Sequence, residues 1–406
     1  MNRRHVIIIG GSMAGLFAAI ALRARGFSVA VYERAGEALA NRGAGIATHD
    51  ELYAAVRAAG IELRAEMGVE SHGRVLFARD GSVLHTQAMH QIMTSWGLIY
   101  RFLRAQVTDA EYFGNHELVD IESASDNVTA VFGNGARARG DWLIGADGAR
   151  SSVRAKVAPE VVARYVGYFG WRGLIDEARV PAAVLEQVAQ RMAFGMAPGG
   201  HWLGYLVAGP DDILEPGHRW YNWGWYRTAD ETRLRDHLTD AAGRYHETGI
   251  PHHLIRPELV AAMREEARGH LAPQIQAIIA ATERPFLQAM VEFCCERLIY
   301  GRTVLIGDAA CTARPHVGLG VSKAAEDAAS FAEALANAQA PADLAQWEQV
   351  RLDYAHAVLR WGQNLGSYIG PQPQDAAQRA TADYHLRPEV LLSQTAASDP
   401  GRYLGH

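Results

Sequence analysis

The chain has 406 residues, of which 49% are hydrophobic and 21% charged, and a formal net charge of −6. This length predicts about two packed units at ~150 residues each, and the composition is that of a globular protein. The negative charge does not attract a phosphate backbone, so no nucleic-acid partner is expected. Cys294, Cys295 and Cys311 lack zinc-ligand spacing and predict three thiols in a reducing cytoplasm.

The first thirty residues predict a strand, a helix and a second strand. Val6–Ile9 is an aliphatic run typical of a strand buried on both faces, and a glycine turn and an Ala/Leu-rich stretch follow it. Ser28–Tyr32 is the second strand of this unit. The basic and apolar start also fits a signal peptide, but Gly10-Gly11 interrupts it. No other stretch approaches the ~20 apolar residues that cross a membrane.

Two later strands and one inserted region complete the predicted fold. The strands at 141–144 and 303–306 run into Gly-Ala-Asp and Gly-Asp, whereas residues 165–230 alternate aromatic and aliphatic side chains between turns. We predict an α/β protein with a parallel, Rossmann-like nucleotide-binding domain and an inserted antiparallel-sheet domain. The expected boundaries are 1–70, 95–160 and 285–335 for the first domain, 71–94 and 161–284 for the second, and 336–406 for a C-terminal helical segment.

The turn from Gly10 to Gly15 stands where a dinucleotide fold places its glycine-rich motif. Such a turn brings backbone N–H groups and a helix N-terminus to a pyrophosphate, and Glu33 ends the second strand where it can accept hydrogen bonds from a ribose. Ser12 replaces the middle glycine of the motif. A tight strand–helix turn without a ligand therefore stays an alternative at this point.

Acidic residues follow the two later strands at the same expected edge of the sheet. Asp147 lies between Ala146 and Gly148, and Asp308 follows Gly307. The carboxyl ends of parallel strands meet at one edge, which is where such sheets bind ligands. A carboxylate at this position also caps helices, and for Asp147 that alternative is open.

Together these segments resemble a known family. Gly10–Gly15 with Glu33-Arg34, Arg42–Ile46, Gly145–Gly148 and the segment 307–320 are similar to the signature motifs of the single-component flavoprotein aromatic hydroxylases, the p-hydroxybenzoate hydroxylase group. The resemblance follows most of the chain. Other segments are most similar to the 2,6-dihydroxypyridine 3-hydroxylase subfamily; they are Arg42–Ile46, Ser95-Trp96, Ala313–His316 and Lys323–Ala325.

The resemblance implies FAD as cofactor, NADH or NADPH as reductant and O2 as oxidant. It implies that a flavin C4a-hydroperoxide hydroxylates a small electron-rich ring of the hydroxypyridine or phenol class. We also expect the protein to be cytoplasmic and to form a homodimer. The positions that match FAD-binding residues are Gly10, Gly11, Ser12, Ala14, Gly15, Glu33, Arg34, Arg42, Gly45, Asp147, Asp308, Pro315, Gly318, Leu319 and Gly320.

Each of these positions carries an implied role. Glu33-Arg34 matches the contacts to the adenosine half, and Arg42 the contact to the phosphate region. Asp147 matches an acid linked to FAD binding and nicotinamide use, and Asp308 the acid that binds the ribityl chain. The loop Pro315–Gly320 matches the backbone that lies against the flavin ring.

The substrate pocket and the base are predicted from residue type. Trp223 and Trp225 share one strand face, Tyr205 lies on a neighbouring hairpin, and such rings can stack on a flat substrate, although ordinary sheet packing is the alternative. Histidine titrates near neutrality, so His316 in the flavin loop and His49 after Ile46 are the candidate bases. A structural role is the alternative for both.

Three other functions stay open. A flavin-dependent halogenase is hinted at by Trp223-Gly224-Trp225, but Arg227-Thr228 follows where Ile-Pro is expected. A nicotinamide-only dehydrogenase leaves the segment 307–320 without a role. A non-catalytic relative that has lost FAD is the third, because Ser12 departs from the motif and Trp96 stands where many relatives carry a phosphate-contacting arginine.

Overall fold

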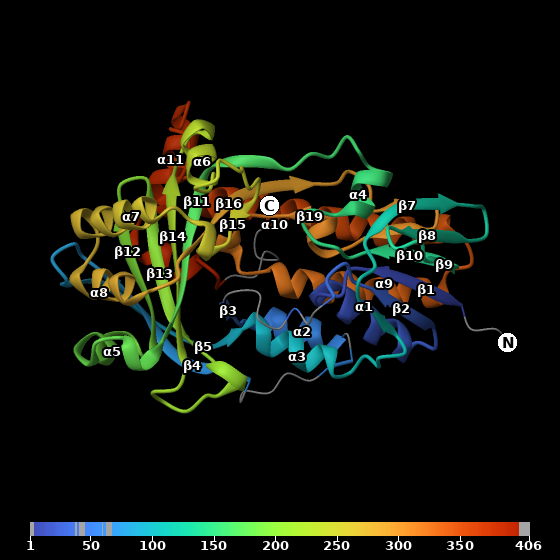
Figure 1. Cartoon of the computed structure of the whole chain (residues 1–406), viewed down its shortest axis with the longest axis horizontal. Helices are drawn as coiled ribbons and strands as arrows, with labels where there is room; N and C mark the ends of the chain where they lie inside the picture. Colours follow the sequence, from blue (N-terminus) through green and yellow to red (C-terminus); the bar gives the residue numbers. More distant parts are fainter. Residues whose placement is uncertain (1–3, 37–38, 40–44, 59, 62–66, 398–406) are drawn as a thin grey trace.

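The computed structural model describes residues 4–36, 39, 45–58, 60–61 and 67–397. Two large sheets lie side by side along the molecule (Figure 1). In the first, the strands run in the order β17 (Ile299–Tyr300), β18 (Thr303–Leu305), β10 (Trp142–Gly145), β1 (His5–Ile9), β2 (Ser28–Tyr32) and β6 (Tyr112–Phe113). All neighbouring strands are parallel except β17 and β18.

The six-stranded sheet confirms the predicted Rossmann-like fold. The aliphatic side chains of β1 are buried on both faces because β2 and β10 flank the strand and helices cover the sheet. The apolar stretch after Gly10-Gly11 forms helix α1 (Met13–Ala24), which packs against α9 (Gly320–Asn337). No helix among the described residues has both the length and the apolar character needed to cross a bilayer.

The second sheet has ten strands. Their order is β15 (Gly249–Ile250), β16 (Phe286–Cys294), β11 (Arg164–Asp176), β14 (Trp220–Thr228), β13 (Gly200–Val207), β12 (Arg191–Ala197), β4 (Val69–Phe77), β5 (Val83–Ser95) and β3 (Gly45–Ala47), and β19 (Cys311–Thr312) pairs with β16. The sheet is mixed rather than antiparallel throughout, because β12 pairs with β4 in parallel. Such a pairing joins segments about 120 residues apart, which strand patterns alone do not reveal.

The two faces of this sheet have different partners. The odd-numbered aromatic residues of β14 lie in one hydrophobic cluster with residues of α7 (Pro257–His270) and α8 (Pro273–Ala281). We call this the outer face. The opposite, inner face carries a second cluster that includes Tyr168, Tyr205 and Tyr226. Helices α7 and α8 and the short α5 (Ala182–Val188) lie on the far side of the large sheet from the first sheet in Figure 1.

The smaller elements surround these sheets. A three-stranded sheet is formed by β7 (Leu118–Ser123), β8 (Val128–Phe132) and β9 (Arg137–Gly140). The remaining helices are α2 (Asp50–Ala58), α3 (Trp96–Arg104), α4 (Ser152–Val157), α5 (Ala182–Val188), α6 (Glu231–His237), α10 (Ala345–Leu365), α11 (Ala376–His385) and α12 (Pro388–Gln394). In α10 the residues Trp347, Val358, Trp361 and Leu365 are buried and form one apolar face of the helix.

A buried ion network fixes the end of β18. Asp327 on α9 accepts hydrogen bonds from Lys323 Nζ at 2.8 Å and from the Gly307 N–H at 2.9 Å, and Arg351 Nε on α10 donates to it at 2.8 Å. The two cations hold the pKa of Asp327 below its usual value against the effect of burial, which acts to raise it. The network holds the peptide that precedes Asp308.

The cysteine prediction was wrong at two positions. Cys294 and Cys311 form a disulfide, because they are directly opposite each other in the short antiparallel ladder of β16 and β19. Cys295 is a buried free thiol, and burial raises its pKa to about 11. A spacing of 17 residues in the sequence contains no signal for this pairing.

Candidate active site

Three parallel strands end together at one edge of the six-stranded sheet. The backbone there is tightly packed: Gly10 has φ +108°, and a Cβ atom at this position would lie 2.4 Å from the Ala146 carbonyl oxygen. Only glycine permits both this φ and this approach of the β1 and β10 ends. The turn therefore keeps its backbone close to any ligand at this edge, although Ser12 replaces the middle glycine of the motif.

Helices α1 and α9 begin at this edge without a described side-chain cap. Ser12 precedes α1 and Leu319 precedes α9, and neither makes a capping hydrogen bond. By contrast, α4 is capped, because Ser151 Oγ accepts from the Arg154 N–H at 2.8 Å. Uncapped N–H groups and the positive end of the helix dipole favour anions and electron-rich ligand atoms.

The two strand-end acids differ in their partners. Asp147 accepts hydrogen bonds from Ser151 Oγ at 2.5 Å, the Ser152 N–H at 2.6 Å and the Val153 N–H at 3.2 Å. Asp147 therefore caps the N-terminus of α4, as the alternative role predicts. No described residue donates a hydrogen bond to the Asp308 carboxylate, and desolvation by the surrounding protein raises its pKa.

The end of β2 carries Glu33 and Arg34. Glu33 is buried, and its carboxylate accepts from the Gly11 N–H at 2.8 Å and the Ala35 N–H at 2.9 Å. Each carboxylate oxygen keeps a lone pair for a further donor. Arg34 is exposed, and the predicted phosphate contact Arg42 lies outside the described residues.

The loop before α9 joins this edge to the ten-stranded sheet. His316 lies in the short helix Pro315–Val317, and its Nε2 shares a 2.8 Å hydrogen bond with the Tyr168 hydroxyl on β11. His49 contacts the same loop, with its Nε2 at 3.3 Å from the Gly318 carbonyl oxygen. The structure therefore brings both candidate histidines to one loop.

A second histidine, which the sequence analysis missed, lies beside His316. The His201 and His316 rings have centroids 5.3 Å apart, and both pack against Tyr226. His201 Nδ1 shares a 2.7 Å hydrogen bond with the Tyr368 hydroxyl. The remaining ring nitrogens, His201 Nε2 and His316 Nδ1, are buried and have no hydrogen-bond partner among the described residues.

Burial sets the charge of this histidine pair. It lowers the pKa of His316 well below the usual value, and it lowers the pKa of His201 to about 3, with the charge of Arg172 adding to the effect. Burial also raises the pKa of the Tyr168 hydroxyl. The pair is therefore neutral at pH 7, and each ring is able to accept and pass on a proton but not to hold a charge stably.

Polar side chains on the inner face of the sheet surround the same region. Tyr205 is buried against the Gly45 backbone, and the Gly45 N–H donates to Asn222 Oδ1 at 3.1 Å. Arg172 on β11 is half-buried and donates to the Tyr226 hydroxyl at 2.9 Å. These contacts join the start of β3 to the inner face and place a guanidinium beside it.

Trp223 and Trp225 do not belong to this group. Both lie on the outer face, where Trp223 Nε1 donates to Thr282 Oγ1 at 2.8 Å. Because side chains alternate along a strand, the inner positions of β14 are Asn222, Gly224 and Tyr226. A Cβ at Gly224 would lie 2.5 Å from an Arg172 terminal nitrogen, so this glycine makes room for the guanidinium. The alternation was readable from the sequence, but which face was inward was not.

Comparisons with known proteins agree with this geometry. A family model described as FAD binding domain-like matches residues 165–292, and one described as an NAD(P)-binding Rossmann-like domain matches residues 8–41. The 2,6-dihydroxypyridine 3-monooxygenase of Paenarthrobacter nicotinovorans is 29% identical over 367 residues, covering 90% of this chain and 91% of the relative. The chain belongs to the FAD-dependent aromatic hydroxylases.

Two further relatives are similar to this hydroxylase over most of its length. The solved structure of 2,6-dihydroxypyridine-3-hydroxylase from Arthrobacter nicotinovorans matches with a TM-score of 0.85 and 28% identity, covering 93% of this chain and 96% of the other. The 6-hydroxynicotinate 3-monooxygenase of Pseudomonas fluorescens is 26% identical over 351 residues, covering 82% of each. The hydroxylase therefore shares its architecture with these relatives over nearly its whole length.

The residues at the sheet edge fit FAD. The close backbone turn at Gly10, the uncapped N-termini of α1 and α9, and the unpartnered carboxylate of Asp308 are groups that a bound dinucleotide would satisfy.

We predict that His201 makes the stability of the hydroxylase depend on pH. Its folded-state pKa of about 3 lies below the unfolded value of 6.5, so unfolding takes up a proton as the pH falls through 6.5. At pH 5 this single group lowers the free energy of unfolding by about 2 kcal/mol. Thermal unfolding between pH 7.5 and 5 should therefore show a smaller loss of Tm for His201→Gln than for the wild type.

The exposed His253 is the matched control. His253→Gln should keep the wild-type pH dependence. An unchanged dependence in His201→Gln would show that His201 is not buried in its neutral form.

Proposed function

We propose that this hydroxylase adds oxygen to a small, ionisable, electron-rich ring of the hydroxypyridine or phenol class. NADH or NADPH is the proposed reductant and O2 the oxidant. The proposal is supported by relatives named as a dihydroxypyridine and a hydroxynicotinate monooxygenase. When bound, FAD supplies electron transfer and oxygen activation, and the side chains of the chain supply the binding and proton handling below.

The observation that carries the substrate class is Arg172. Its guanidinium is half-buried on the inner face, it donates to the Tyr226 hydroxyl, and no ion pair with a described carboxylate is found. Arginine stays charged in proteins and forms strong hydrogen bonds to anionic oxygen. A ring whose hydroxyl has ionised would bind here and would be held in its electron-rich form.

The neutral histidine pair supports a route for the proton that the ring hydroxyl releases. We assign His316 and Tyr168 to this relay, since a 2.8 Å hydrogen bond joins them and no described residue bonds to His316 Nδ1. Because burial disfavours a charged imidazole, His316 would pass the proton on rather than keep it. His49 is the second candidate at the same loop.

Tyr205 is the proposed aromatic wall of the pocket, because it lies on the inner face against Gly45. The apolar surroundings of the inner face, which include Leu203 and Met196, would exclude water from the ring. Exclusion of water favours transfer of oxygen to the substrate over release of hydrogen peroxide.

A substrate screen tests the proposal. Hydroxylated pyridines and hydroxybenzoates are added to the yellow holoenzyme, NADH and NADPH oxidation is followed, and products are identified by mass. One class should stimulate oxidation strongly and gain one oxygen atom. Activity that requires chloride and yields a halogenated ring would favour the halogenase instead. A chain that cannot be reconstituted with FAD would contradict the proposal.

We predict different effects of removing the two strand-end acids on FAD affinity. Asp308 is the proposed ribityl ligand, and no described residue donates to its carboxylate. We therefore expect Asp308→Ala to weaken FAD binding about 10- to 100-fold, which corresponds to about 1.4–2.8 kcal/mol. Asp147 is occupied by the α4 cap, so Asp147→Ala should lower the free energy of unfolding by about 1 kcal/mol and have a smaller effect on FAD affinity. Fluorescence titration of the deflavinated variants measures both affinities. Equal losses would contradict the distinction.

Arg172 should set the affinity for the ionised ring. We expect Arg172→Met to raise the KM of the true substrate about 10- to 100-fold, because a charge-assisted hydrogen bond contributes about 1.5–3 kcal/mol. FAD affinity should not change. Arg191→Met on β12 is the matched control, since that side chain is exposed. An unchanged KM in Arg172→Met would place substrate recognition elsewhere.

His316→Ala should separate NAD(P)H oxidation from hydroxylation. Loss of a proton relay typically lowers the step it serves by ~10²–10⁴-fold. We expect FAD binding to persist, hydroxylated product per NAD(P)H to fall, and hydrogen peroxide to rise. Loss of flavin in this variant would identify His316 as structural. Unchanged coupling and pH profile would direct the search to His49.

A further inference from the structure

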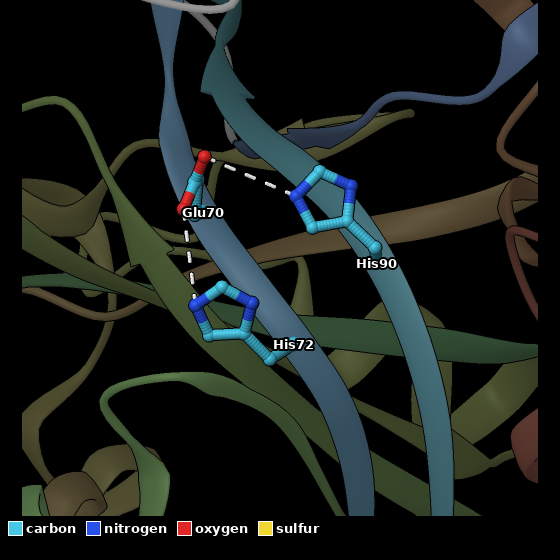
Figure 2. A group of neighbouring side chains, drawn as sticks. All are labelled: Glu70, His72 and His90. Carbon is cyan, nitrogen blue, oxygen red and sulfur yellow. Dashed lines mark ion pairs between the residues drawn. The ribbon is translucent and has the colours of Figure 1, made fainter.

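Three exposed metal-ligand side chains gather on the β4–β5 hairpin, apart from the candidate active site. Ser71 and Gln91 are cross-strand partners with buried side chains. Their neighbours Glu70, His72 and His90 therefore point to the opposite side of the hairpin, where all three are exposed (Figure 2). Two strands thus present one carboxylate and two imidazoles at one place.

The geometry of this cluster is close to that of a metal site. The Glu70 carboxylate oxygens lie 3.8 Å from His72 Nε2 and 3.9 Å from His90 Nε2, and one ligand atom from each residue lies within 4.8 Å of the others. Zinc bonds of 2.0–2.2 Å in a tetrahedron separate ligand atoms by roughly 3.3–3.6 Å. Side-chain rotations that move the ligand atoms by about 1 Å would bring the three exposed residues to this spacing.

We propose that Glu70, His72 and His90 bind a divalent transition-metal ion of the Zn²⁺ class. Two imidazole nitrogens and one carboxylate oxygen are donors that such ions prefer, whereas Ca²⁺ and Mg²⁺ take oxygen ligands. Three protein ligands leave the fourth position to water. The exposure of the cluster lets the ion exchange with solvent.

The cluster is also able to form plain ion pairs, and pH distinguishes the two arrangements. Ion pairs with Glu70 need protonated histidines, whereas metal binding needs the neutral imidazoles and therefore strengthens as the pH rises. An increase of affinity from pH 5.5 to 7.5 is therefore expected only for the metal site.

A bound ion would stabilise the hairpin that holds the C-terminal segment against the loop of His316. On the side away from the cluster, Arg74 donates to the Leu392 carbonyl at 2.9 Å, and Gln91 donates to the Ala396 carbonyl at 3.0 Å. The Ala396 N–H in turn donates to the His316 carbonyl at 2.8 Å. The ion cross-links β4 to β5 directly behind these contacts.

The test uses the holoenzyme after removal of metals with a chelator. Zn²⁺ is titrated in competition with a chromophoric chelator at pH 7.5, and retained zinc is measured by mass spectrometry after gel filtration. The wild type should retain one equivalent and show a higher Tm with Zn²⁺, because a ligand that binds the folded state stabilises it. His72→Ala/His90→Ala should lose both effects, and Glu70→Gln should weaken binding.

The matched control is His252→Ala/His253→Ala, which removes two neighbouring exposed histidines elsewhere. It should keep the zinc equivalent and the Tm shift. Cu²⁺ bound to the wild type should show two nitrogen ligands by electron paramagnetic resonance. Retention of the equivalent by His72→Ala/His90→Ala, or its loss in the control, would overturn the proposal. The outcome is independent of FAD binding and of the aromatic substrate.

Discussion

The candidate site depends on the contact between the loop before α9 and the inner face of the ten-stranded sheet. The Tyr168–His316 hydrogen bond and the Gly45–Asn222 hydrogen bond join residues that are 148 and 177 positions apart. Through them, the sheet edge that fits FAD faces the surface that we propose for the substrate. If this contact were lost, each half would keep its own core, but the polar groups of the inner face would no longer lie opposite the loop.

Two buried histidines, His201 and His316, lie at this contact. Protein interiors normally satisfy their hydrogen-bonding groups, yet one nitrogen of each ring has no partner in the part of the chain that the structure describes. Their rings stay neutral because burial disfavours the charged form, and each ring keeps one hydrogen bond to a tyrosine. Such groups cost stability, and a proton-transfer role offers a physical reason for retaining them.

Local patterns predicted the elements, and long-range contacts decided the site. The aliphatic run of β1, the glycine turn and the acids after β10 and β18 are local signals, so the Rossmann-like sheet was predictable. His201, Arg172 and Tyr226 were missed because their meeting with His316 depends on strand order and on which face turns inward. The Cys294–Cys311 pairing was missed for the same reason, since a two-residue ladder leaves no periodic pattern. The parallel β12–β4 pair likewise has no local signature.

Side chains alternate between the two faces of the large sheet, so its residues fall into two sets. One set can be substituted while the other is kept. On β14, the outer set of Tyr221, Trp223 and Trp225 maintains the core with α7 and α8, whereas the inner set of Asn222, Gly224 and Tyr226 faces the loop. A library confined to inner positions would vary the surface that we propose for the substrate and leave the outer packing against α7 and α8 unchanged. On β14 the outer positions thus maintain the packing against α7 and α8, and the inner positions are the ones to vary in a search for other substrates.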